Sequence, residues 1–169
     1  MREGRIYQIN SKPETPGEHG LPKIATQSSY VAVGGLEGDF NRGRHERHND
    51  NPDWAVLLMP IETIEELNSE GWPIKAGDIG ENITSQGVAY AAFEPGTKWR
   101  IGEAVIQITI PCTPCKNLYL LPYVGDDKGP AFLKTMIDRR GWYARVLKPG
   151  RIARTDGIEE LVEDASSSV

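Results

Sequence analysis

Alternation of apolar and polar residues runs through most of this chain and predicts a series of β-strands. The clearest case is residues 104–110, where Ala, Ile, Ile and Ile are separated by Val, Gln and Thr. Residues 54–59 are almost continuously apolar, which is typical of a strand buried on both faces. Further strands are expected at residues 5–9, 29–33, 83–84, 99–101, 142–147 and 158–162.

Helical spacing occurs in two places. Residues 60–69 place Ile61, Ile64 and Leu67 on one face. Residues 130–140 place four apolar side chains at helical spacing: Phe132, Leu133, Met136 and Ile137. Both stretches are followed by a glycine, which commonly ends a helix, so we predict two short helices with their apolar faces in the core.

Two segments show no periodicity and are predicted to be long loops, residues 11–22 and residues 34–52. The chain also contains 18 glycines and 12 prolines, which favour turns over long helices. We therefore expect a mainly β fold, with one domain over residues 1–162 and a disordered tail over residues 163–169.

The charge balance argues against binding to polyanions. The chain has 169 residues, with 24 acidic and 19 basic ones, for a net charge of −5. Attraction to phosphate backbones or anionic lipid surfaces depends on positive charge, so neither nucleic acid nor a membrane is expected as a partner. The first ten residues lack an apolar core and no stretch reaches the ~20 apolar residues of a membrane span, which predicts a cytoplasmic protein.

The chemistry is concentrated in Cys112-Thr113-Pro114-Cys115-Lys116, which follows the strand at 104–110 and holds the two cysteines of the chain. A thiol where a strand ends can face a cleft and act as a nucleophile or a soft metal ligand. In a reducing compartment, two cysteines at this spacing indicate a metal-binding, redox or catalytic role before a structural disulfide.

Two alternatives follow from the residues alone. Together with His45 and His48, the cysteines would make a zinc site, although only two residues separate these histidines and the cysteines come later in the chain. A thioredoxin-like redox pair is disfavoured because such motifs open a helix after a strand, and Pro111 and Pro114 interrupt this segment.

Five short blocks follow one another along the chain: Gly35-Leu36-Glu37-Gly38-Asp39, Gly80-Glu81-Asn82-Ile83-Thr84, Ile101-Gly102-Glu103-Ala104, Pro111-Cys112-Thr113-Pro114-Cys115 and Gly141-Trp142-Tyr143-Ala144-Arg145-Val146. In order and spacing they resemble the signature blocks of the MOSC family, which is named for the C-terminal domain of molybdenum cofactor sulfurases. The chain resembles the short, free-standing branch of this family. The resemblance implies a MOSC-type β-barrel with a few short helices that binds the molybdenum cofactor in its molybdopterin form.

The resemblance also implies roles for individual residues. Cys115 falls on the family's cysteine, which in relatives holds molybdenum or handles sulfur, whereas Cys112 stands where family members often have arginine. Asn82 resembles a cofactor contact, or is a turn residue. Thr63 lies where relatives place a hydroxyl against the cofactor, and it also fits a capping box with Glu66.

The remaining cofactor-binding predictions concern charged residues. Lys23 resembles a family lysine near the anionic cofactor. Asp39 is expected to hold its loop by bonding to backbone amides. Arg42, Arg44 and Arg47 give the loop at 34–52 a positive charge suited to the cofactor phosphate, or else face solvent.

Two functions remain open. The first is an oxidoreductase that reduces N-hydroxylated compounds with Cys115 as a molybdenum ligand and an electron-donor protein as partner. The second is a carrier of sulfur or cofactor, in which Cys112 and Cys115 share a persulfide and a sulfur-donor protein is the partner.

Overall fold

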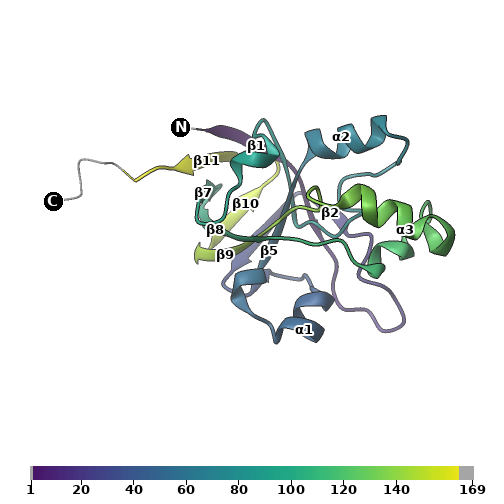
Figure 1. The fold of residues 1–169 in the computed structure, drawn as a ribbon. Coiled ribbons are helices and arrows are strands. Elements are labelled where there is room, and N and C mark those ends of the chain that lie inside the picture. The colour runs from purple at the N-terminus through teal and green to yellow at the C-terminus, as the bar shows by residue number, and fades with distance from the viewer. Residues whose placement is uncertain (1, 164–169) are drawn as a thin grey trace.

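The structure is a computed structural model that describes residues 2–163. Eleven strands and three α-helices fall within this range (Figure 1). The strands are β1 Glu3–Ser11, β2 Ile24–Thr26, β3 Ser28–Ala32, β4 Gly35–Leu36, β5 Val56–Pro60, β6 Ile83–Gln86, β7 Lys98–Ile101, β8 Ala104–Pro111, β9 Trp142–Lys148, β10 Gly150–Ala153 and β11 Gly157–Leu161. The helices are α1 Arg42–His48, α2 Ile61–Ser69 and α3 Gly125–Met136.

Seven strands close into a barrel. The sheet order is β11-β7-β8-β9-β5-β6-β1-β2, and β11 also pairs with β1. Strand β1 closes the barrel because it pairs with β11 along one edge and with β6 along the other, and Arg5 pairs with both strands. The pairing with β6 has an irregularity between Ile6 and Gln8. Closure removes the exposed sheet edges among these seven strands. The expectation of a mainly β barrel with a few short helices is confirmed.

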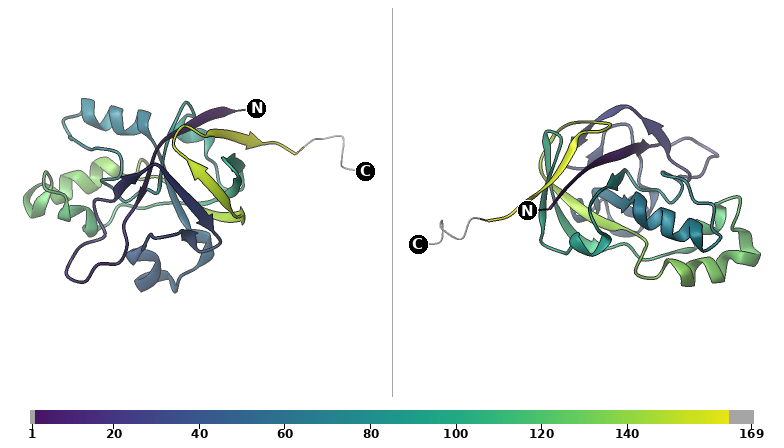
Figure 2. Two further views of the ribbon diagram at one scale, coloured as in Figure 1. Left: turned by 180° about the vertical axis from the view of Figure 1, so that it is seen from behind. Right: turned by 90° about the horizontal axis from the view of Figure 1, so that it is seen from above.

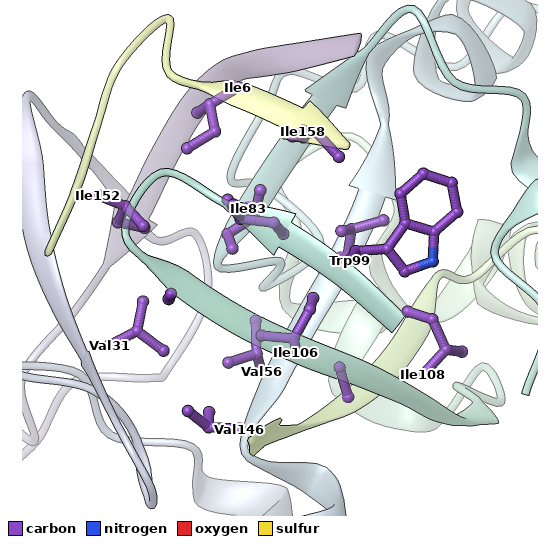
Figure 3. Close-up of a cluster of buried hydrophobic side chains, with 14 of the residues drawn as sticks. Ile6, Val31, Val56, Ile83, Trp99, Ile106, Ile108, Val146, Ile152 and Ile158 are labelled. Carbon is purple, nitrogen blue, oxygen red and sulfur yellow. The ribbon is translucent and has the colours of Figure 1, made fainter. Parts of the chain in front are cut away.

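The barrel interior is filled by the apolar half of each alternating strand. Side chains such as Ile6, Ile83, Ile106 and Ile158 come from different strands and lie in one buried cluster, with the fully buried Trp99 at one side of it (Figure 3). Alternation predicted these strands correctly because every second residue faces inward. Strands β2 and β4, with three and two residues, are too short to show this pattern, and β10 contains only one large apolar side chain, Ile152.

A second apolar cluster lies outside the barrel. Helices α2 and α3 sit on the same side of the molecule in both Figure 1 and Figure 2, and their buried faces share Ile64, Leu67, Phe132 and Met136. Helix α2 also provides the crossover that parallel strands require, since β5 and β6 pair in parallel.

The structure corrects two predicted elements. The second helix spans Gly125–Met136 instead of residues 130–140, with Asp126 and Asp127 in its first turn and Pro130 inside it. Ile137 is its C-cap and is 56% exposed, so this residue does not belong to the buried face. Acidic residues stabilise a helix N-terminus, so Asp126 and Asp127 mark the start of this helix, and Pro130 does not.

The segment predicted to be a loop at residues 34–52 contains β4 and α1. The Asn41 side chain accepts a hydrogen bond from the Arg44 N–H at 2.9 Å, and Asn49 adopts a left-handed conformation at the C-cap. Two asparagine caps therefore define a helix that has no buried side chain and so no apolar period.

Across residues 2–163, the helices are too short or too polar for any of them to cross a membrane. The tail predicted at residues 163–169 lies, apart from Glu163, outside the described residues.

Candidate functional site

A cavity of about 640 Å³ opens beside the end of the barrel. Its walls come from the loop at residues 17–23, from α1 and the residues before it, from the start of β5, and from the cysteine segment. The N-terminal loop and α1 lie side by side (Figure 2) because the Phe40 N–H donates to the Lys12 carbonyl at 2.9 Å. Residues far apart in the sequence thus surround one space.

Both cysteines line this cavity. Cys112 follows β8, and its N–H donates to the Gly141 carbonyl at 2.8 Å, which places the thiol against Leu57 and Tyr143. Cys115 is half-buried and begins the short 3-10 helix Lys116–Leu120. Within the described chain both are free thiols, and Cys115 is the more accessible of the two.

Gly141 brings β9 close to β5. Its φ is +107°, and a Cβ at this position would lie 2.8 Å from the Leu58 carbonyl oxygen. A glycine therefore permits the approach that sets Arg140 on one side and Tyr143 on the other at the cavity wall.

Helix α1 contributes positive charge. Arg42 and Arg47 line the cavity, and Nη2 of Arg47 lies 3.9 Å from the Cys115 sulfur. Arg42 also pairs with Glu46 on the helix surface at 3.0 Å. Arg44 is not among the lining residues, and its buried Nε has no hydrogen-bond partner within residues 2–163.

Aromatic rings form another part of the wall. His48 stacks on Trp54 with ring centroids 3.6 Å apart, and Trp54 lies 4.4 Å from Tyr143. Burial, followed by the charge of Cys112, raises the pKa of the Tyr143 phenol, which therefore remains protonated at neutral pH. This wall combines flat apolar surface with a neutral hydroxyl.

Arg140 was missed by the sequence analysis. It lines the cavity with only 6% of its surface exposed, and its Nε and Nη1 have no partner in the described part of the chain. In the sequence it is one of two adjacent arginines, and Arg139 instead pairs with Glu70 at 2.5 Å. The sequence shows that two adjacent arginines precede β9. Which of them turns inward is set by tertiary packing.

Glu81 belongs to the second family block, and the sequence alone indicates no role for it. Its side chain is fully buried, and one oxygen accepts a hydrogen bond from the Gly77 N–H at 2.5 Å. Burial raises the pKa of this carboxyl to about 8, although the Gly77 bond and then the Arg140 charge act in the opposite direction.

Three predicted cofactor residues form a network with one another. Lys23 lies 2.5 Å from one Asp39 oxygen, and the Asn82 amide donates to the other at 2.9 Å. The Lys12 N–H also donates to Asp39 at 2.9 Å, as expected for an acid that holds a loop. Of these residues Lys23 lines the cavity, whereas Asp39 and Asn82 support the wall behind it.

Thr63 is not brought to the cavity. It is buried in α2, and this helix begins after Pro60 without a side-chain cap. The predicted capping box between Thr63 and Glu66 is therefore wrong, because Thr63 lies inside the helix and not at its N-cap.

The zinc arrangement does not form. Nδ1 of His45 lies 3.0 Å from Asp50, and His48 is stacked on Trp54. Among residues 2–163, no three His, Cys, Asp or Glu side chains converge as metal ligands. The charged side chain next to the Cys115 sulfur is therefore Arg47 and not a histidine.

Comparison with known proteins assigns the family. The family model described as MOSC domain matches residues 45–159. The chain belongs to the MOSC family. This family is linked to molybdenum cofactor-related proteins.

Two bacterial proteins are similar in sequence to most of this chain. Protein YiiM of Escherichia coli strain K12 is 31% identical over 136 residues, which cover 78% of this chain and 58% of YiiM. The uncharacterized protein YflK of Bacillus subtilis strain 168 is 30% identical over 149 residues, 85% of this chain and 64% of YflK. The chain thus spans less than two thirds of the length of either relative.

Solved structures share the fold of this MOSC protein. The YuaD protein of Bacillus subtilis superposes with a TM-score of 0.79 at 17% identity, over 96% of this chain and 97% of YuaD. YiiM from Geobacillus stearothermophilus gives a TM-score of 0.71 at 24% identity, over 97% of this chain and 78% of that one.

Proposed function

We propose that this MOSC protein binds the molybdenum cofactor in the cavity and is an oxidoreductase that removes oxygen from N-hydroxylated compounds. The observation that carries the proposal is the position of Cys115. Its free thiol lines a cavity large enough for a cofactor, and a guanidinium lies 3.9 Å from the sulfur.

The chemistry of the donor set fits this cofactor. A thiolate is a soft ligand that suits a transition metal bound through sulfur. The cofactor carries a phosphate, and Arg42 and Arg47 offer planar cationic groups on the same wall in a protein with a net charge of −5. Cys115 would hold the metal, and these arginines would hold the phosphate.

The other lining residues have supporting roles. Lys23 adds a cation to the wall and is held by Asp39, whose other carboxylate oxygen accepts a hydrogen bond from Asn82. His48 stacked on Trp54, with the tilted Tyr143 ring beside them, would exclude water from one side and offer apolar surface to a substrate. When bound, the cofactor supplies two-electron redox chemistry.

The reaction balances as a two-electron reduction. The N–O bond of the N-hydroxyl group breaks, two electrons and two protons are taken up, and an amine and one water are released. The electrons come from outside the chain, so an electron-donor protein is part of the proposal.

Turnover and metal content test the proposal together. Protein produced in a host that makes the cofactor is expected to contain molybdenum and to show pterin fluorescence after oxidative release. With an artificial electron donor it should reduce an amidoxime or an N-hydroxylated base over many cycles. Metal-loaded protein that gives no multiple turnover with any such substrate would contradict the reductase assignment.

A sulfur carrier is the second candidate, and the presence of Cys112 in the same cavity favours it. In that case a persulfide donor should transfer its outer sulfur to one thiol and be released as a thiol itself, and an acceptor should remove that sulfur stoichiometrically. Mass spectrometry of the intact chain distinguishes the two functions, because a reductase does not consume its cysteine.

A further inference from the structure

Arg140 is a buried cation at the cavity wall that forms no salt bridge within residues 2–163. It is 6% exposed, and its Nε and Nη1 have no hydrogen-bond partner within residues 2–163. Its neighbour Arg139 forms ion pairs with Glu66 and Glu70 and does not line the cavity. The two adjacent arginines therefore serve different purposes.

An unpaired buried guanidinium is costly, because arginine does not lose its proton and burial removes its hydration. The groups whose charges act on Arg140 are Cys112, Tyr143, Cys115 and Glu81. The phenol of Tyr143 is neutral at neutral pH. Glu81 has a pKa of about 8, so below that pH its carboxyl is mostly protonated and does not neutralise the guanidinium.

We propose that Arg140 binds a carboxylate of the small-molecule substrate, so that the compounds processed in this cavity are N-hydroxylated molecules that also carry a carboxylate. A guanidinium presents parallel N–H donors that match the two carboxylate oxygens. The proposal rests on the proposed function for the reaction itself. Binding of the carboxylate depends on the chain alone and is measured without cofactor.

Alkylation of the cavity thiols measures this binding directly. In iodoacetate and iodoacetamide the thiolate sulfur attacks the methylene carbon, a C–S bond forms, the C–I bond breaks and iodide leaves, while the thiol proton passes to solvent. Iodoacetate carries a carboxylate, whereas iodoacetamide carries a neutral amide in its place. The ratio of their rates at Cys115 therefore reports attraction of the carboxylate, and a change in thiol ionisation cancels because it affects both reagents.

For the wild-type protein, the iodoacetate rate is expected to saturate with concentration and to be lowered competitively by propionate but not by propionamide. Arg140→Gln should lower the iodoacetate to iodoacetamide ratio by about tenfold, as for loss of a charge-assisted hydrogen bond. Arg139→Gln, the matched control, should leave the ratio within about twofold of wild type.

Several results would overturn the proposal. One is a wild-type iodoacetate rate that does not saturate and is not lowered by propionate. This result would overturn the proposal even if Arg140→Gln does not fold. Another is an equal fall in the ratio for Arg139→Gln and Arg140→Gln, which would reflect general surface charge. A third is loss of molybdenum from Arg140→Gln down to the level of Cys115→Ser, which would assign the guanidinium to the cofactor. Absence of molybdenum from the wild type would instead count against the proposed function and leave the alkylation test intact.

Discussion

The Nζ of Lys23 lies 2.5 Å from Oδ1 of Asp39, and both side chains are nearly inaccessible to solvent. The pair joins the loop that ends at Lys23 to the segment before α1, and Asn82 completes it by donating to the second Asp39 oxygen. The walls of the cavity are thus tied together by a buried charge pair whose members are 16 residues apart.

Loss of one partner from this pair should destabilise the fold. Lys23→Met leaves the Asp39 carboxylate buried with two neutral donors, and we expect the free energy of unfolding to fall by about 3 to 5 kcal/mol. Urea denaturation measures this. The double variant Lys23→Met with Asp39→Asn should recover part of the loss, because no unpaired charge remains; a larger loss in the double variant would contradict the pairing.

The two cysteines should differ in their effect on cofactor content. Cys115→Ser is expected to lower bound molybdenum by about tenfold or more, since serine is a much poorer ligand for a soft metal. Cys112→Ser should have a smaller effect, because this thiol is buried against Leu57 and Tyr143. Metal analysis of the two purified variants checks the prediction, and equal retention in both would remove Cys115 as the ligand.

The arginines of α1 should also differ. Arg42 and Arg47 line the cavity, whereas Arg44 does not, so Arg42→Ala combined with Arg47→Ala should reduce cofactor content more than Arg44→Ala does. The sequence alone predicts a cofactor contact for Arg44 as well. Pterin fluorescence measures cofactor content, and melting curves must be unchanged for the comparison to hold. Greater loss with Arg44→Ala would place the phosphate on the other side of the helix.

Glu81 should make stability depend on pH. Burial raises its pKa in the folded state from 4.5 to about 8, so between these values the folded state holds a proton that the unfolded state has released. Raising the pH through this window therefore favours unfolding, by at most about 1.4 kcal/mol per pH unit from this one group.

Glu81→Gln should remove this contribution, so its stability relative to wild type should increase from pH 5 to pH 8. Urea midpoints at several pH values measure the difference. Glu65→Gln, an exposed carboxyl on α2, is the control and should give a nearly constant difference. A constant difference for Glu81→Gln as well would show that this carboxyl is already ionised in the folded protein.

The sequence by itself determined the strands of the barrel, the helix at Ile61–Ser69 and the family. These features depend on local patterns: alternation of apolar residues, helical spacing, and short blocks in a set order. It also singled out the two cysteines, because a thiol at the end of a strand is unusual enough to be noticed. Local pattern was insufficient where an element carries no buried face, as in α1, or too few residues, as in β4.

Only the tertiary structure decided which charged residues turn inward. Arg139 and Arg140 are adjacent and chemically identical, yet Arg139 pairs with Glu70 of the α2 end, whereas Arg140 lines the cavity. Lys23 and Asp39 likewise meet only because two loops pack together. Burial of charge depends on contacts between distant segments, and for that reason no local pattern revealed it.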